Sequence, residues 1–139
     1  FHSCRLPEVV GAVRALRRQF AQQRLVLAGF SLGGNFMLRV AAEAPRAGIA
    51  IDRVLAVHAL EMTPHAPAML DELWRVLAPG GKLLLVVPNR AGPWARMDST
   101  PFGQGQPFSR KQLISLLREA AFTPVGWSEA LWMPPFSRK

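Results

Sequence analysis

The sequence lacks most of what disulfide-linked, metal-binding or membrane-spanning proteins are built from. Cys4 is the single cysteine among 139 residues, which excludes an internal disulfide and a cysteine-based metal cluster. No apolar run reaches the roughly 18 residues that a membrane-spanning helix needs, and no signal peptide is visible. We therefore expect a cytoplasmic chain that holds no metal and does not bind a membrane.

Tyrosine is absent, and the basic residues form no cluster. Seventeen Lys and Arg residues against nine Asp and Glu give a formal net charge of +8, but they are spread over the whole chain. A nucleic-acid-binding surface usually combines clustered basic residues with stacking aromatic rings. We therefore expect an ordinary basic surface and no nucleic-acid partner.

Apolar residues are abundant. They make up 50% of the sequence, which predicts a globular protein with a substantial core. The length fits one domain, residues 1–139, and is too short for two well-packed ones. The chain begins with Phe1 and not with methionine, from which we expect a fragment or a chain whose start was removed.

Helical and strand-like segments alternate along the chain. Apolar residues recur at helical spacing in some segments, whereas others are short apolar runs, typical of buried parallel strands. This order predicts an α/β fold, an open and mostly parallel sheet of about four strands with crossover helices, made of joined Rossmann-like half-domains. The expected elements are a helix at 7–22, a strand at 25–30, a helix at 32–44, a strand at 51–57, a helix from Thr63 to the sequence APGG, a strand at 82–89, a helix at 109–121 that a Ser109–Gln112 capping box opens, and a strand at 122–132.

A G-x-S-x-G spacing marks the turn between the first strand and the next helix. Gly29 and Gly33 flank Ser31, and such glycines let the strand and the helix approach closely. Ser31 is therefore a candidate nucleophile at the carboxyl edge of the sheet, and the backbone N–H of Leu32 is a candidate oxyanion donor.

Residues 2–57, with the sequences LVLAGFSLGGNFMLRVAAEAP and IDRVLAV, resemble the middle of an α/β-hydrolase. The resemblance implies that Ser31 is the nucleophile and Leu32 an oxyanion-hole amide. It also implies that the acid, the histidine and the second oxyanion amide belong to segments that this chain lacks. His58 follows the next strand and is a candidate base. The alternative, which we prefer, is that the turn only joins strand to helix.

From Asp52 onward the sequence resembles the carboxyl half of a class I S-adenosylmethionine-dependent methyltransferase. The most specific part is the helix and apolar strand of ELWRVLAPGGKLLLVVPN. The resemblance implies that the segment from Val57 to Glu61 lies beside the cofactor. It also implies that the glycine-rich turn and the acid that bind the cofactor precede the matched part, so no bound cofactor is expected. The alternative, which we prefer to a catalytic role, is that His58 and Glu61 are a polar pair that supports the loop.

Both resemblances share the strand at 51–57. We therefore predict a chimera, deliberately recombined, with a hydrolase-like half at 1–57 and a methyltransferase-like half at 58–139. Its expected function is that of an α/β scaffold without a complete catalytic site or a small-molecule ligand, and so not that of an enzyme. The alternatives are a weak serine esterase that uses Ser31 and a residual S-adenosylmethionine-binding module near His58 and Glu61.

The order of the strands also predicts a partner. If the first three strands lie side by side in sequence order, right-handed crossovers place their connecting helices on one face of the sheet. The other face is then bare, and an exposed apolar sheet face is normally covered by a partner. We expect a homodimer or a higher oligomer, unless the first helix or the Pro/Gly-rich loop from Pro88 to Phe108 folds over this face.

Overall fold

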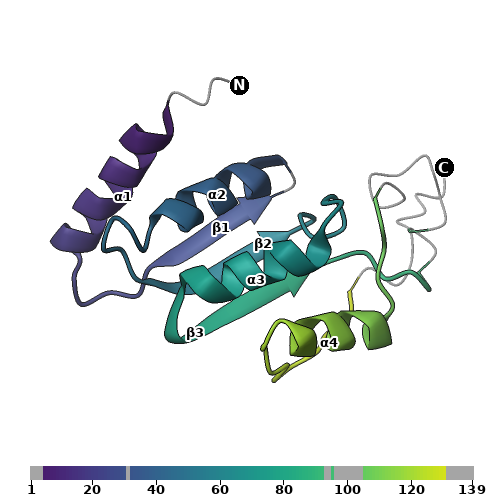
Figure 1. Ribbon diagram of the computed structural model, residues 1–139. Coiled ribbons are helices and arrows are strands. Elements are labelled where there is room, and N and C mark those ends of the chain that lie inside the picture. Colours follow the sequence, from purple (N-terminus) through teal and green to yellow (C-terminus); the bar gives the residue numbers. More distant parts are fainter. Residues whose placement is uncertain (1–4, 31, 93–94, 96–104, 131–139) are drawn as a thin grey trace, which may run out of the picture.

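The computed structural model describes residues 5–30, 32–92, 95 and 105–130. Helices and strands alternate in the order that the sequence predicts as far as the last helix (Figure 1). The elements are α1 (Leu6–Gln19), β1 (Val26–Phe30), α2 (Leu32–Glu43), β2 (Ile51–Val57), α3 (Ala66–Val76), β3 (Leu77–Val86) and α4 (Arg110–Glu119). No helix among the described residues is long and apolar enough to cross a membrane.

The sheet is parallel and open, with three strands in the order β1-β2-β3. The predicted α/β class is confirmed, but the expectation of about four strands is wrong for the described part of the chain. The expected strand at 122–132 is irregular over its described residues, 122–130. Pro124 removes a backbone donor from this segment, and Val125 is 90% exposed, so no strand of the described part of the chain pairs with it or covers it.

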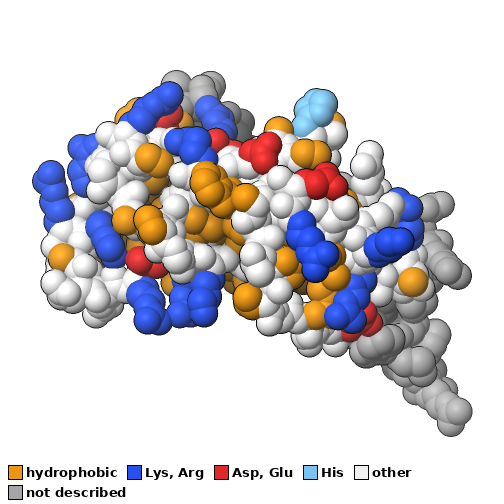
Figure 2. Space-filling view, turned by 60° about the horizontal axis from the view of Figure 1, so that its bottom comes forward, with side chains coloured by type: hydrophobic (Ala, Val, Ile, Leu, Met, Phe, Trp, Pro, Cys, Tyr) orange, Lys and Arg blue, Asp and Glu red, His pale blue; other side chains and the backbone are white. Residues whose placement is uncertain are grey.

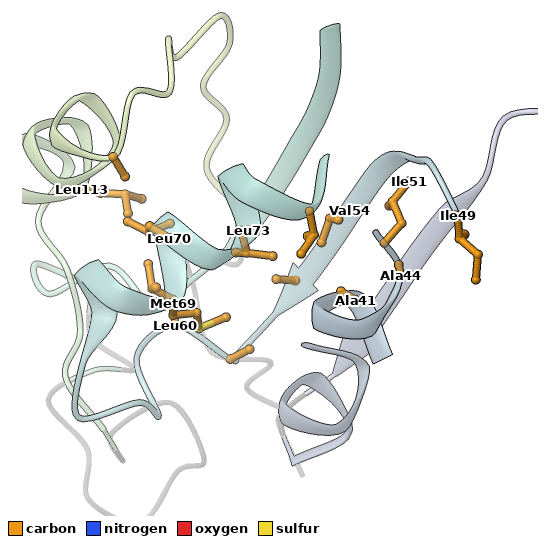
Figure 3. Close-up of a cluster of buried hydrophobic side chains, with 14 residues drawn as sticks. Ala41, Ala44, Ile49, Ile51, Val54, Leu60, Met69, Leu70, Leu73 and Leu113 are labelled. Atoms are coloured by element: carbon orange, nitrogen blue, oxygen red, sulfur yellow. The ribbon is translucent and has the colours of Figure 1, made fainter. Parts of the chain in front are cut away.

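The two crossover helices, α2 and α3, lie side by side on one face of the sheet (Figure 1). Between these helices and β2 lies the core, in which Ile51, Leu60, Leu70 and Leu73 are fully buried. Figure 3 shows this cluster running from Ile49 and Ile51 across α3 to Leu113 of α4. The core is therefore one-sided, because it fills only the space between the sheet and its helices.

α1 contributes little to the core. None of its residues is buried, and it contacts α2. In the turn after α2, the Ala47 carbonyl accepts a hydrogen bond from the Arg14 guanidinium at 3.1 Å. A second link comes from Asp52, whose Oδ2 accepts from the Leu25 amide at 2.8 Å and lies 3.4 Å from Arg17 Nη1. α1 therefore stays on the side of α2 and does not fold over the opposite face of the sheet.

Two helix ends differ from the predicted ones for local reasons. Thr63 does not cap α3, because its hydroxyl accepts from the His65 amide at 3.3 Å and forms a separate turn. The sequence APGG does not follow the end of α3 as a stop signal. It belongs to β3, where Ile51 pairs with Leu77 and Arg53 with Lys82, so residues 78–81 bulge out opposite a single residue of β2.

Candidate functional site

The turn from β1 into α2 is closely packed at two glycines, Gly29 and Gly34, which are five residues apart. A Cβ atom added to Gly29 would lie 2.6 Å from the Gly34 Cα, and one added to Gly34 would lie 2.9 Å from the Ala59 Cβ. A Cβ on Gly33 would meet nothing within 4 Å. The expectation that flanking glycines permit close approach is therefore right for Gly29 but wrong for Gly33, because Gly34 is the second tightly packed position.

Ser31 lies outside the described residues, so its predicted role as a nucleophile stays a prediction. Leu32 is the first residue of α2, and its amide is one of the N-terminal helix amides that have no partner within the helix. Its predicted role as an oxyanion donor is equally untested. What the structure does establish here is a helix N-terminus at the carboxyl edge of the sheet.

His58 and Glu61 form a close pair at the same edge. His58 directly follows β2 and has a left-handed backbone, with φ at +50°, and its amide donates to the Val86 carbonyl of β3 at 3.0 Å. The His58 Nδ1 lies 2.7 Å from the Glu61 Oε1. The Glu61 side chain is 3% exposed and that of His58 is 32% exposed, so the carboxylate lies inside and the imidazole reaches the surface.

One oxygen of this carboxylate stands out. The Glu61 Oε2 is buried and has no hydrogen-bond partner among the described residues. Burying a charged oxygen without a partner is costly. A buried polar atom without a partner calls for an explanation, and at this edge of the sheet a donor from a bound ligand would supply one.

The returning end of the loop from Pro88 to Phe108 packs on Glu61. The Gln106 amide donates to the Glu61 carbonyl at 2.9 Å, and Gly105 has φ at +89° with no room for a Cβ, which would lie 2.6 Å from that carbonyl oxygen. The Phe108 amide donates to the Pro88 carbonyl at 3.2 Å and closes the base of the loop. The length of this loop predicts a functional role, and its described ends do reach the edge with His58 and Glu61.

The space beneath the turn is small. An apolar crevice of about 10 Å³, lined by Gly29, Gly34, Met37 and Ala59 among others, lies between α2 and the sheet. It has room for about one water molecule. A ligand at this edge would therefore contact the turn and His58 from the open side. Within the described ranges, no group of three or more His, Cys, Asp or Glu side chains is arranged to hold a metal ion.

The sequence pointed to His58 and Glu61 as a pair, and the structure brings them together. The sequence alone did not reveal the role of Gly34 or the contact of Gly105 and Gln106 with Glu61. The available signal for Gly34 was the double glycine at the start of the helix. The contact of residues 105 and 106 had no local signal, because it joins segments more than 40 residues apart.

A family model and a solved structure match this chain. A family model described as a methyltransferase domain matches residues 6–125. A solved structure, a SAM-dependent methyltransferase from Thermotoga maritima, aligns with a TM-score of 0.51 and 19% sequence identity over 81% of this chain and 70% of that chain. No curated protein matches. At this identity the structural likeness shows the fold alone.

The methyltransferase match also bears on the predicted chimera. It begins within α1 and continues without interruption across Val57, where the junction was expected. None of these comparisons supports a hydrolase-like first half. The strand–turn–helix of residues 26–43 therefore falls inside the methyltransferase match.

Proposed function

Since the chain belongs to the methyltransferase-domain family, we propose that it binds S-adenosylmethionine at the carboxyl edge of its sheet, with His58 and Glu61 as a proton-accepting pair beside the methyl group. The observation that carries the proposal is the buried Glu61 carboxylate with one oxygen unpartnered among the described residues. In open parallel sheets, ligands bind outside the carboxyl ends of the strands. His58, Glu61 and the glycine turn all lie there.

The glycine turn fits the cofactor in two respects. Gly29 and Gly34 allow the close packing of β1 on α2, whereas the backbone at Gly33 faces open space and can be approached by a ligand. The N-terminus of α2 opens directly after β1. Helix N-termini favour anionic groups, which suits the carboxylate of the amino-acid part of the cofactor.

His58 and Glu61 suit the removal of a proton from the molecule that accepts the methyl group. The cofactor would supply a methyl group on a positively charged sulfur. A protic acceptor, such as an amine or a hydroxyl group, gives up a proton when it is methylated. An imidazole held by a carboxylate at 2.7 Å is oriented to take such a proton, as a general base does.

Calorimetric titration of the full chain with S-adenosylmethionine and S-adenosylhomocysteine tests the proposal. Because the site is an open edge with little enclosed volume, we expect weak binding, with a Kd on the order of 10⁻⁴ M, or about −5.5 kcal/mol. Gly33→Val, which meets no protein atom near its Cβ, should remove the heat of binding and keep the fold. ATP serves as the control ligand.

Two results would overturn the proposal. One is the absence of heat at millimolar S-adenosylmethionine from protein that circular dichroism shows to be folded. The other is hydrolysis of p-nitrophenyl acetate that Ser31→Ala abolishes, together with no cofactor binding, which would revive the esterase alternative.

A further inference from the structure

The face of the sheet opposite α2 and α3 carries a regular grid of side chains. Successive residues of a strand point to opposite faces, and the strand register aligns the three strands in rows. Val26, Arg53 and Lys82 form the row at the amino ends, and the other two rows follow two and four residues later along each strand. We call this grid the open sheet face; its members are Val26, Ala28, Phe30, Arg53, Leu55, Val57, Lys82, Leu84 and Val86.

The open sheet face is apolar and exposed. Phe30 is 60% exposed, Leu84 62%, Val26 54% and Val86 41%, and no described helix lies over them. Figure 2 shows a neighbouring side of the molecule, where hydrophobic side chains gather in the middle with Lys, Arg, Asp and Glu side chains around them. Contiguous apolar patches on the order of 300–600 Å² are at the upper limit for a free monomer surface and mark interaction sites.

We propose that the open sheet face is the interface of a homodimer, in which two copies stack their sheets face to face about a twofold axis that runs across the strands. Sheets stack about 10 Å apart when their facing side chains are apolar. Such an axis superimposes the middle row of one copy, with Ala28, Leu55 and Leu84, on the same row of the other copy. Each residue of this row then faces the same residue of the other copy, so alanine packs on alanine and leucine on leucine.

The two cations of the face decide the direction of stacking. Arg53 and Lys82 pair across neighbouring strands at the amino end of the grid, and no carboxylate belongs to the face. With the strands of the two copies antiparallel, the cation rows lie at opposite ends, about 13 Å apart along the strands. This separation exceeds the Debye length of about 8 Å at physiological salt. Both side chains then lie at the rim, where their charged ends stay hydrated.

The area of the open sheet face determines how tightly we expect two copies to bind. Two copies would bury on the order of 1,000 Å² in total, near the lower limit of specific interfaces, so we expect a Kd in the micromolar range. The other conceivable occupant is an acidic amphipathic helix of a different protein, which the two cations would attract. The second copy is favoured because the grid is apolar in two of its three rows and superimposes on itself.

Sedimentation velocity of the full chain over a range of concentrations tests the proposal. The native chain should shift from monomer to dimer as its concentration rises through the micromolar range. Leu84→Lys should keep it monomeric, because two like charges would meet in the middle row; at 62% exposure the substitution leaves the monomer folded. Trp74→Lys, on the exposed side of α3 at 55% exposure, is the matched control and should still dimerise.

Mixing complementary variants gives the sharpest result. Leu84→Lys and Leu84→Glu should each be monomeric, and an equimolar mixture of the two should restore the dimer, because residue 84 of one copy faces residue 84 of the other only in the antiparallel stack. A native chain that stays monomeric at every concentration overturns the proposal. So does a dimer that survives Leu84→Lys, and so does a monomer that instead binds an acidic amphipathic peptide through this face.

Discussion

At the scale of the residue, Glu61 is the most informative position in the chain. Its carboxylate is buried, one oxygen faces His58 Nδ1 at 2.7 Å, and the other lacks a hydrogen-bond partner among the described residues. Buried polar groups that lack a hydrogen-bond partner are expected at functional sites, where a protein gives up some stability in favour of binding. The stability of a neutral variant can therefore separate a functional role from a structural one.

Glu61→Gln should leave the protein as stable as the native chain or more stable, by up to about 1 kcal/mol, because an unpaired buried amide costs less than an unpaired buried charge. The same variant should weaken S-adenosylmethionine binding. Urea denaturation and calorimetry measure the two effects. If Glu61→Gln instead lowers the free energy of unfolding while binding is unchanged, the carboxylate is a structural group, and its place in the proposed site is lost.

Two neighbouring glycines form a matched pair for the turn. Gly34→Ala should destabilise the protein by about 1–3 kcal/mol, the usual cost of overpacking, since its Cβ would lie 2.9 Å from the Ala59 Cβ. Gly33→Ala meets open space and should stabilise α2 by up to about 1 kcal/mol through helix propensity. Urea denaturation of both variants checks this, and equal effects would contradict the close approach.

At the scale of the element, several patterns within one segment predicted the structure correctly, whereas contacts between segments could not be predicted. The strand at 51–57 is observed over the same residues, because its apolar run needs only burial. The capping box is present as well, with the Gln112 amide donating to Ser109 Oγ at 3.2 Å and the Ser109 amide to Gln112 Oε1 at 3.0 Å. The strand expected at 122–132 failed, because a strand forms only where another strand offers it a partner.

The candidate site also combines a pattern within one segment, which the sequence shows, with contacts between segments, which it does not. The G-x-S-x-G spacing at Gly29 to Gly33 suggested a hydrolase, whereas the methyltransferase match covers the same residues. A strand, a tight turn and a helix recur in unrelated α/β families, so this local pattern does not identify one. Only the three-dimensional contact of Gly34 with Ala59 distinguishes the glycine that packs from the glycine that is open. His58 and Glu61 were recognisable from their place after a buried strand, whereas the burial of Glu61 under the returning loop was not.

Arg75 joins two helices and makes one part of the stability depend on pH. Its guanidinium donates two hydrogen bonds to Glu72, at 2.8 and 2.6 Å, and one to the Ala42 carbonyl of α2 at 3.0 Å. The hydrogen bonds from Arg75 hold the pKa of the Glu72 carboxyl below its ordinary value of 4.5. Glu72 therefore stabilises the fold above this pH, and the contribution is lost as the pH falls through and below it.

Thermal unfolding across the acidic range tests this link. Arg75→Met should lower the Tm at neutral pH and make the further loss of Tm on acidification shallower than in the native chain. Arg118→Met is the control, because Arg118 is an exposed residue of α4 and is not among the groups that lower the pKa of Glu72. Parallel pH profiles for the native chain and Arg75→Met would contradict the predicted role of the pair.

At the scale of the whole molecule, the sequential strand order produces a sheet with two different faces. All described helices that pack on the sheet share one face, which holds Leu70 and Leu73 at 0% exposure. The other face leaves Leu84 exposed among its neighbours. The monomer therefore derives its stability from one side, and the second side is available for association.

Two leucines on opposite sides of the sheet separate folding from association. Leu73→Ala should lower the free energy of unfolding by about 2–5 kcal/mol at every protein concentration, the usual cost of removing a buried leucine. Leu84→Ala should leave dilute protein as stable as the native chain. At high concentration the native chain gains stability from dimerisation by mass action, and Leu84→Ala should lose that gain. The measurement is the Tm of the three proteins as a function of protein concentration. A native Tm that does not rise with concentration would contradict the proposed dimer. The expected destabilisation by Leu73→Ala does not depend on that result.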